Sequence, residues 1–154
     1  MSTKSIPDGY HTITPYITVR DGAAALDFYQ RAFGATIFMR METPGGKIMH
    51  AEFRIDGSPV MLSSEFPEMG AISPETLRGC ASSLMIYVEN VDARFEQAIA
   101  AGGVVERPLK DQFYGDRSGT LKDPFGHRWT IATHVEDVAP DEMDRRIAAM
   151  AGGG

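Results

Sequence analysis

Cysteine is nearly absent from this sequence, and so is any clustered excess of positive charge. Cys80 is the single cysteine among 154 residues, so no disulfide can form within the chain. The net charge is −6, with 15 Lys and Arg against 21 Asp and Glu. This balance argues against nucleic acid as a partner, because phosphate binding needs clustered cations. No apolar run is long enough to span a bilayer, and the first residues lack a signal-peptide pattern. These absences predict a cytoplasmic protein with neither a membrane nor a nucleic-acid partner.

The sequence contains one unit written twice. Asp56-Gly57 and the stretch 123–126, Asp-Pro-Phe-Gly, are both hairpin signals. Gly57 and Gly126 are 126 − 57 = 69 residues apart, and the same offset takes Val19 to Val88. A chain of 154 residues is too short for two full-sized domains. We therefore expect one domain, 1–154, built from two half-size modules that share a core.

The first module is expected over about residues 11–65. Alternating apolar residues predict a strand over 11–19. Asp21 is a natural N-cap for an amphipathic helix that Gly34 closes. Strands follow over 36–41, 47–55 and 58–64. In the strand 47–55, two sets of side chains alternate between the faces: Met49, Ala51, Phe53 and Ile55 against Ile48, His50, Glu52 and Arg54.

A linker over residues 66–80 leads to the second module, expected over about 81–134. Its strand 82–88 precedes a helix that Asn90 caps and that glycines 102 and 103 end. Three further strands are expected around 104–107, 118–122 and 127–133. After Pro140, Asp141 is predicted to cap a helix over about 140–150. The apolar stripe of this helix needs a surface to cover it and consists of Met143, Ile147 and Met150.

The repeated order of a strand, a helix and three strands resembles the vicinal oxygen chelate superfamily, which includes glyoxalase I, bleomycin-resistance proteins, fosfomycin-resistance enzymes and extradiol dioxygenases. The residues that carry the resemblance include Val19-Arg20-Asp21, Ala32-Phe33-Gly34 and Asp123-Pro124-Phe125-Gly126-His127. The stretches 49–53 and 114–117 and the Trp129 strand are similar to the PhnB-like branch. The resemblance implies an α+β fold: two tandem βαβββ modules forming a U-shaped mixed sheet, with the helices outside.

Enzymes of this superfamily hold a divalent metal in the cleft of the sheet. Counted from the shared motifs, the ligand positions implied by the resemblance are Thr14, Met61, Ser83 and Thr130. Neutral hydroxyls and a thioether are poor ligands for a catalytic divalent ion, which prefers imidazole, carboxylate or thiolate. We therefore predict no metal and no other cofactor.

The predicted cleft carries rings, thioethers and hydroxyls. Such a surface suits a small, mostly apolar molecule with a few hydrogen bonds, although the same side chains can simply close the sheet. Arg117 can present a guanidinium to an anionic group, or it can pair with Asp116 within the loop. The predicted cleft residues are Thr14, Tyr16, Met61, Ser63, Ser83, Met85, Tyr87, Thr130 and Arg117.

His50 and Glu52 are the candidates for chemistry, because they share a strand face two residues apart. They can act as a base with an orienting partner or as displaced metal ligands, or they form a solvated pair outside the cleft. His127 follows a turn glycine and is expected to hydrogen-bond the turn. His134 falls at the end of a strand, where a surface position is expected. Cys80 has no histidine nearby in sequence, so a catalytic thiol is not predicted.

Three functions remain open at this point. The first is a glyoxalase/bleomycin-resistance-like protein that binds a small, partly apolar molecule without metal. The second is a metal-dependent lyase, isomerase or dioxygenase that uses His50 and Glu52, with or without His134. The third is a structural or regulatory dimer. A homodimer is expected. One chain supplies only one pair of modules, and in proteins of this superfamily two such pairs commonly associate.

Overall fold

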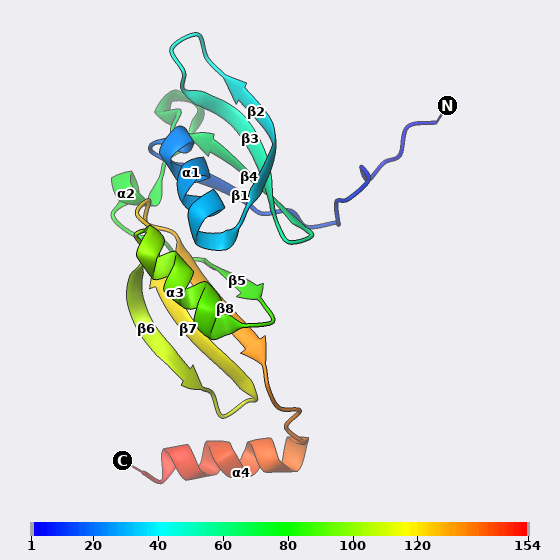
Figure 1. Cartoon of the computed structure of the whole chain (residues 1–154), viewed down its shortest axis with the longest axis vertical. Coiled ribbons are helices and arrows are strands. Elements are labelled where there is room, and N and C mark those ends of the chain that lie inside the picture. The colour runs from blue at the N-terminus through cyan, green and yellow to red at the C-terminus, as the bar shows by residue number, and fades with distance from the viewer. Residues whose placement is uncertain (1, 154) are drawn as a thin grey trace.

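The computed structural model describes residues 2–153 and contains two four-stranded sheets in tandem (Figure 1). Sheet 1 has the strand order β1-β4-β3-β2, and sheet 2 has the order β5-β8-β7-β6. The first strand of each module runs parallel to the fourth, and the other pairs are antiparallel. The α+β fold of two βαβββ modules is thus confirmed. The elements are β1 (Tyr16–Val19), α1 (Gly22–Phe33), β2 (Thr36–Glu42), β3 (Ile48–Ile55), β4 (Ser58–Ser64), η1 (Pro67–Met69), α2 (Pro74–Leu77), β5 (Ser83–Tyr87), α3 (Val91–Ala101), β6 (Val104–Asp111), β7 (Asp116–Lys122), β8 (Arg128–His134) and α4 (Pro140–Ala151).

The two long module helices begin and end at the predicted caps. The Asp21 side chain accepts a hydrogen bond from the backbone N–H of Ala24 at 3.0 Å, and Asn90 does the same for Ala93 at 3.1 Å. Gly34 ends α1 with φ 65°, a left-handed conformation that glycine adopts without steric cost. Helices α1 and α3 pack against each other on the same side of the two sheets (Figure 1).

The linker 66–80 holds η1 and the single turn α2. Two sequence predictions about the elements are wrong. The strand predicted over 11–19 begins only at Tyr16, after Pro15, which has no N–H to donate to a ladder. Ala139, not Asp141, occupies the N-cap position of α4. Pro140 takes the first helical position, which suits its fixed φ.

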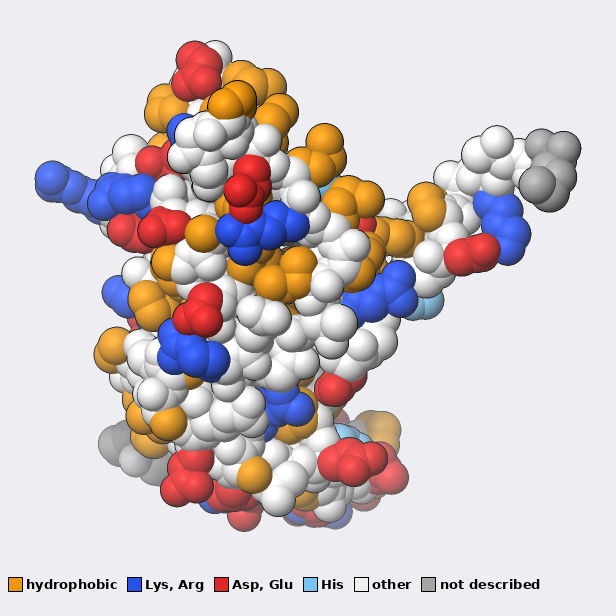
Figure 2. Space-filling view, turned by 45° about the horizontal axis from the view of Figure 1, so that its top comes forward, with side chains coloured by type: hydrophobic (Ala, Val, Ile, Leu, Met, Phe, Trp, Pro, Cys, Tyr) orange, Lys and Arg blue, Asp and Glu red, His pale blue; other side chains and the backbone are white. Residues whose placement is uncertain are grey.

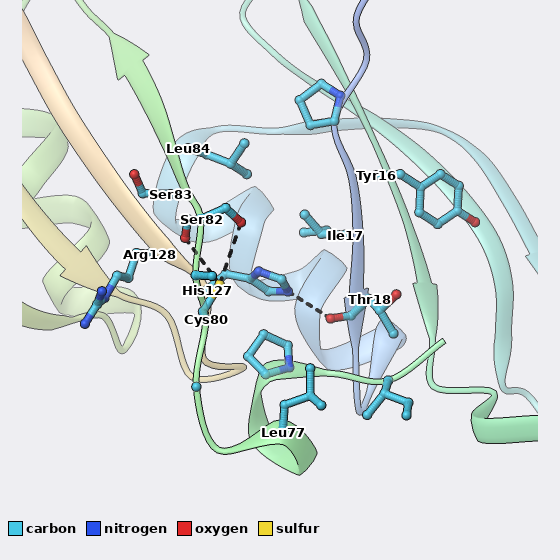
Figure 3. A pocket seen from close by; sticks show the side chains of 15 residues that line it. Tyr16, Ile17, Thr18, Leu77, Cys80, Ser82, Ser83, Leu84, His127 and Arg128 are labelled. Atoms are coloured by element: carbon cyan, nitrogen blue, oxygen red, sulfur yellow. Dashed lines mark hydrogen bonds between the residues drawn. The ribbon is translucent and has the colours of Figure 1, made fainter. Parts of the chain in front are cut away.

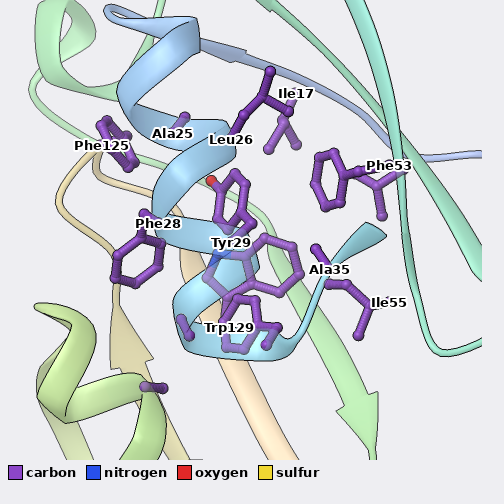
Figure 4. Packing of buried hydrophobic residues seen from close by; sticks show 14 of the residues in the cluster. Ile17, Ala25, Leu26, Phe28, Tyr29, Ala35, Phe53, Ile55, Phe125 and Trp129 are labelled. Carbon is purple, nitrogen blue, oxygen red and sulfur yellow. The ribbon is translucent and has the colours of Figure 1, made fainter. Parts of the chain in front are cut away.

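One hydrophobic core joins the two modules. Tyr29 and Phe33 of α1 pack against Trp129 of β8, with ring centroids 5.3 Å and 4.8 Å apart respectively. Phe53 of β3 stacks on the other side of Tyr29 at 5.1 Å. Figure 4 shows Tyr29 on α1 between Phe53 and Trp129, and Phe125 of the turn also packs against Tyr29. Neither module therefore has a complete core of its own.

Asp123 is the buried polar centre of this junction, with 3 % of its surface exposed. Its Oδ2 accepts hydrogen bonds from the Tyr29 hydroxyl at 2.6 Å and from the Trp129 indole N–H at 2.8 Å. Its Oδ1 accepts from the backbone N–H groups of Phe125 and His127, each at 2.9 Å. A buried carboxylate needs such partners. The turn that opens β8 is thus tied to α1 of the other module.

Glu65 fastens the linker to sheet 1, and its titration predicts an acid-sensitive fold. Hydrogen bonds from Ser73 and Thr76 hold the pKa of Glu65 at about 2, against about 4.3 in an unfolded chain. A lowered pKa stabilises the fold above the unfolded value, and this stabilisation is lost as the pH falls toward 2. We expect Glu65→Gln to cost about 2 kcal/mol at pH 6 and much less at pH 2.

Urea unfolding at the two pH values measures this difference. Glu68→Gln is the matched control, because Glu68 is an exposed residue of the same linker. If Glu65→Gln costs as much at pH 2 as at pH 6, the carboxylate does not stabilise the linker in this way.

Candidate functional site

The sheet faces opposite α1 and α3 form an open face that carries large hydrophobic side chains. Trp129, Ile131 and Leu121 point toward the helices and are buried, so alternation turns their neighbours to the open face. Figure 2 looks at the other side of the molecule, from which α1 and α3 are seen in front of the sheets in Figure 1; there hydrophobic and charged side chains are interspersed, and acidic ones gather at the lower end, near α4. The large hydrophobic side chains of the open face are between 41 % and 59 % exposed and include Tyr16, Phe38, Met39, Met41, Met49, Met85 and Tyr87.

Two β-bulges, at Phe38 of β2 and at Met49 of β3, interrupt the simple alternation of side chains between the two faces. The register of β2 against β3 shifts between Ile37 and Met39 and again opposite Met49. Each extra residue changes which face the following side chains take. Met49 is therefore 48 % exposed although the residues of its alternating set, Ala51, Phe53 and Ile55, are buried, and Ile48 is buried instead. The predicted alternation fails at Met49 and Ile48 for that reason.

A chain of hydrogen bonds crosses the open face of sheet 1. His50 Nε2 lies 2.9 Å from Glu52 Oε1, and a carboxylate only accepts, so this nitrogen carries the proton. His50 Nδ1 is then free to accept from the Tyr16 hydroxyl, 2.9 Å away. The Tyr10 hydroxyl donates to the second carboxylate oxygen of Glu52. Two predicted candidates, His50 and Glu52, are thus joined to a predicted cleft residue, Tyr16.

The sheet register explains why these residues meet. Tyr16 of β1 is paired with Met61 of β4, and Met61 with Glu52 of β3. Neighbouring strands lie about 4.8 Å apart, so a tyrosine and a histidine side chain together span the intervening strand. His50 lies two residues before Glu52 on the same face. It therefore lies between the carboxylate and the phenol.

The Glu52 carboxylate is ionised at neutral pH although it is buried. Burial alone raises the pKa of Glu52, but hydrogen bonds from His50 and Tyr10 outweigh it, and the pKa lies below its ordinary value. The hydrogen bond to Glu52 in turn raises the pKa of Tyr10. Exposure increases along the chain: Glu52 is 7 % exposed, and Tyr16 at the other end is 51 % exposed.

A second chain of hydrogen bonds occupies the open face of sheet 2. The Tyr87 hydroxyl donates to Asp116 Oδ2 at 2.8 Å, and His134 Nδ1 lies 2.8 Å from Asp116 Oδ1. The second ring nitrogen of His134 lies 2.8 Å from Asp137. Hydrogen bonds to these two carboxylates raise the pKa of His134. This imidazole is held between two acids at the surface, where the sequence placed it.

The predicted cleft residues do not all line one hollow. Tyr16 and Ser63 line a hollow of about 480 Å³ beside η1, which we call the Tyr16 hollow. Ser83 and Thr130 line a polar hollow, also about 480 Å³, with Arg107. The nine residues that line the Tyr16 hollow are all uncharged: Tyr16, Thr18, Thr43, Met49, Ser63, Phe66, Met69, Gly70 and Ala71.

A third hollow, of about 440 Å³, lies between β1 and β5 and contains Cys80 and His127 (Figure 3). Figure 3 shows the Tyr16 ring turned away from this space and toward sheet 1. His127 Nε2 lies 2.8 Å from the backbone oxygen of Thr18, so the His127 ring joins the two modules instead of bonding its own turn. Cys80 donates to the backbone oxygen of Ser82 at 3.3 Å.

Arg117 does not belong to the open face. Its guanidinium binds Asp92 of α3 at 2.8 Å and Asp111 of β6 at 3.3 Å, so the side chain lies on the helix side of sheet 2. The predicted Asp116–Arg117 pair is also absent from the described contacts, because adjacent strand residues point to opposite faces. Sequence reasoning missed Tyr10, which lies before β1 and outside any regular element, yet hydrogen-bonds Glu52.

The four positions that the resemblance links to metal do not fit a divalent ion. Thr14 precedes β1, Met61 lies in sheet 1, and Ser83 and Thr130 lie in sheet 2. Their donors are three hydroxyls and a thioether, a set that lacks the imidazole or carboxylate that such ions require. Across residues 2–153, no three His, Cys, Asp or Glu side chains are grouped so that they could hold a metal. Within the same range, no helix is long and apolar enough to cross a membrane.

Comparison with known proteins identifies the family and supports the two-module fold. The model of the Glyoxalase/Bleomycin resistance protein/Dioxygenase superfamily matches residues 9–131. The uncharacterized protein Mb0911c of Mycobacterium bovis is 38 % identical over 144 residues, which cover 92 % of this chain and 95 % of the relative. The crystal structure of TioX from Micromonospora sp. ML1 matches with a TM-score of 0.64 and 27 % identity, over 82 % of this chain and 100 % of TioX.

A PhnB protein from Bacillus cereus shares the fold, with a TM-score of 0.61 and 22 % identity, over 80 % of this chain and 99 % of that protein. The resemblance to the PhnB-like branch is thus confirmed at the level of the fold. Because the family model spans most of the chain and both modules, the chain belongs to the glyoxalase/bleomycin resistance protein/dioxygenase superfamily.

Proposed function

We propose that this protein binds a small, partly apolar and uncharged molecule on its open face, without a divalent metal. The observation that carries the proposal is the Tyr16 hollow. Its lining combines thioether and aromatic side chains with the hydroxyls of Tyr16, Thr18 and Ser63. Apolar walls with a few placed polar groups are typical of ligand sites. Methionine adapts to more than one ligand shape. The single free cysteine agrees with a cytoplasmic site of action.

The test of this proposal is binding of a neutral fluorescent probe, N-phenyl-1-naphthylamine, whose emission rises in apolar surroundings. Saturable binding at one site per chain supports the proposal. Emission that rises only linearly with protein concentration, without saturation, would overturn it.

The alternative of a metal-dependent lyase, isomerase or dioxygenase is less well supported by the geometry. A histidine binds metal through a free ring nitrogen. Both nitrogens of His50 are already used, one by Tyr16 and one by Glu52. If the displaced-ligand enzyme were correct, purified protein would retain metal that the double variant His50→Ala, Glu52→Ala loses.

We further propose a homodimer, in which a second copy covers part of the open face. The exposed thioethers and rings of that face and the stripe of α4 both favour a partner surface. Ile147 and Met150 of the stripe are 49 % and 61 % exposed, so α4 does not bury it within the subunit. We expect light scattering at micromolar concentration to give twice the 16.8 kDa chain mass. A monomer that persists as the concentration rises would contradict the dimer.

A further inference from the structure

Tyr16, His50 and Glu52 have the arrangement of a proton relay. A histidine acts as a base when one ring nitrogen faces the group to be deprotonated and a carboxylate holds the other. Here the Tyr16 hydroxyl faces Nδ1 at 2.9 Å, and Glu52 holds Nε2 at 2.9 Å. The carboxylate is buried and ionised, and Tyr10 orients it from the far side.

Only the outer end of this relay reaches the Tyr16 hollow. Tyr16 lines the hollow, whereas His50, Glu52 and Tyr10 do not. A bound molecule therefore touches the phenol, and the imidazole acts through it. Because its one proton is donated to His50 Nδ1, the phenol oxygen meets a bound molecule as an acceptor and can take a proton from a neighbouring acidic carbon. None of the lining residues carries a charge, so the lining itself gives carboxylates and phosphates no ion pair; the nearby Lys47 ammonium lies over the Phe66 ring, 4.1 Å from its centroid.

From this geometry we infer that the protein catalyses proton transfer on a neutral, enolisable ketone bound beside Tyr16. The C–H bond next to the carbonyl breaks, and its proton passes to Tyr16 Oη. The phenol proton passes at the same time to His50 Nδ1, and the imidazolium is stabilised by the Glu52 carboxylate. Reversal returns a proton to the same carbon or to its conjugated neighbour. No oxidant, reductant or metal takes part, so the net reaction is exchange or isomerisation. Tyr16 is the catalytic residue, and His50 and Glu52 are positioning residues.

The inference rests on the proposed binding function, and one experiment separates the two. 2-Tetralone, a neutral aromatic ketone, is incubated with the full-length protein in D₂O, and proton NMR follows loss of the signals next to its carbonyl. Saturation-transfer NMR measures binding of the same ketone. We expect exchange well above the buffer rate. Tyr16→Phe should lower the rate at saturating ketone by about 10²-fold or more and leave the half-saturation concentration nearly unchanged, which a merely structural role would not do.

Glu52→Gln should lower the rate in the same direction, because the amide no longer stabilises the imidazolium. Tyr114→Phe is the matched control, since Tyr114 packs on Phe113 outside the relay, and its rate should equal that of the unmodified protein. Exchange that is no faster in the unmodified protein than in Tyr16→Phe overturns the relay, whether or not the ketone binds. Binding without exchange would leave the binding function intact.

Discussion

Asp123→Ala is expected to destabilise the fold by about 4 kcal/mol, because the substitution leaves several buried donors without an acceptor, each at a cost of roughly 1–3 kcal/mol. The hydroxyl of Tyr29, the indole of Trp129 and two backbone N–H groups all converge on this carboxylate. Thermal unfolding followed by circular dichroism should show a midpoint lower by roughly 10 °C in a chain of this length.

Two matched variants separate the carboxylate from general effects of substitution. Tyr29→Phe removes one donor and keeps the ring stack, so it should cost only about 1 kcal/mol. Asp27→Ala removes an exposed carboxylate of α1, the helix that carries Tyr29. This carboxylate pairs with Arg31, and its loss should cost less than about 1 kcal/mol. If Asp123→Ala were as mild as Asp27→Ala, the turn would not be what joins the two modules.

Met49→Asp is expected to weaken binding of N-phenyl-1-naphthylamine by at least about tenfold, because a carboxylate in an apolar site must lose part of its hydration. Met49 lines the Tyr16 hollow and is 48 % exposed. The folded state should therefore tolerate the change, and the thermal midpoint should shift little.

Met49→Leu is the control for this experiment, since it keeps the volume and the apolar character of the side chain. Fluorescence titration should give nearly the same dissociation constant for Met49→Leu as for the unmodified protein. Equal binding by Met49→Asp would show that the probe binds elsewhere on the molecule.

The repeat made most of the fold predictable. The 69-residue offset pairs each hairpin of one module with its counterpart in the other, and it pairs the N-caps Asp21 and Asn90, which lie where the sequence placed them. Periodicity fails where one extra residue changes the faces of a strand, as the bulge at Met49 does. A bulge has no signal in the alternation itself. The short helices of the linker were missed because turns of this length have no period to detect.

The candidate site was predictable only in part. Sequence spacing placed His50 and Glu52 on one face. The hydrogen bond from Tyr16 to His50, however, depends on the pairing of β1 with β4, in which Tyr16 lies opposite Met61, 45 residues further along the chain. Tyr10 reaches Glu52 from a segment without periodicity. Arg117 was predicted to line the cleft, but the pairing of β7 with β8 turns its side chain to the helix side of sheet 2. Long-range register, more than local pattern, decides which side chains meet.

The most direct test of metal-free binding on the open face is isothermal calorimetry of the purified, chelator-treated protein with zinc, nickel, manganese and iron(II), beside a titration with N-phenyl-1-naphthylamine. A donor set of three hydroxyls and one thioether predicts no stoichiometric metal binding, together with saturable binding of the apolar probe. Tight binding of any of these ions at one per chain would contradict the account.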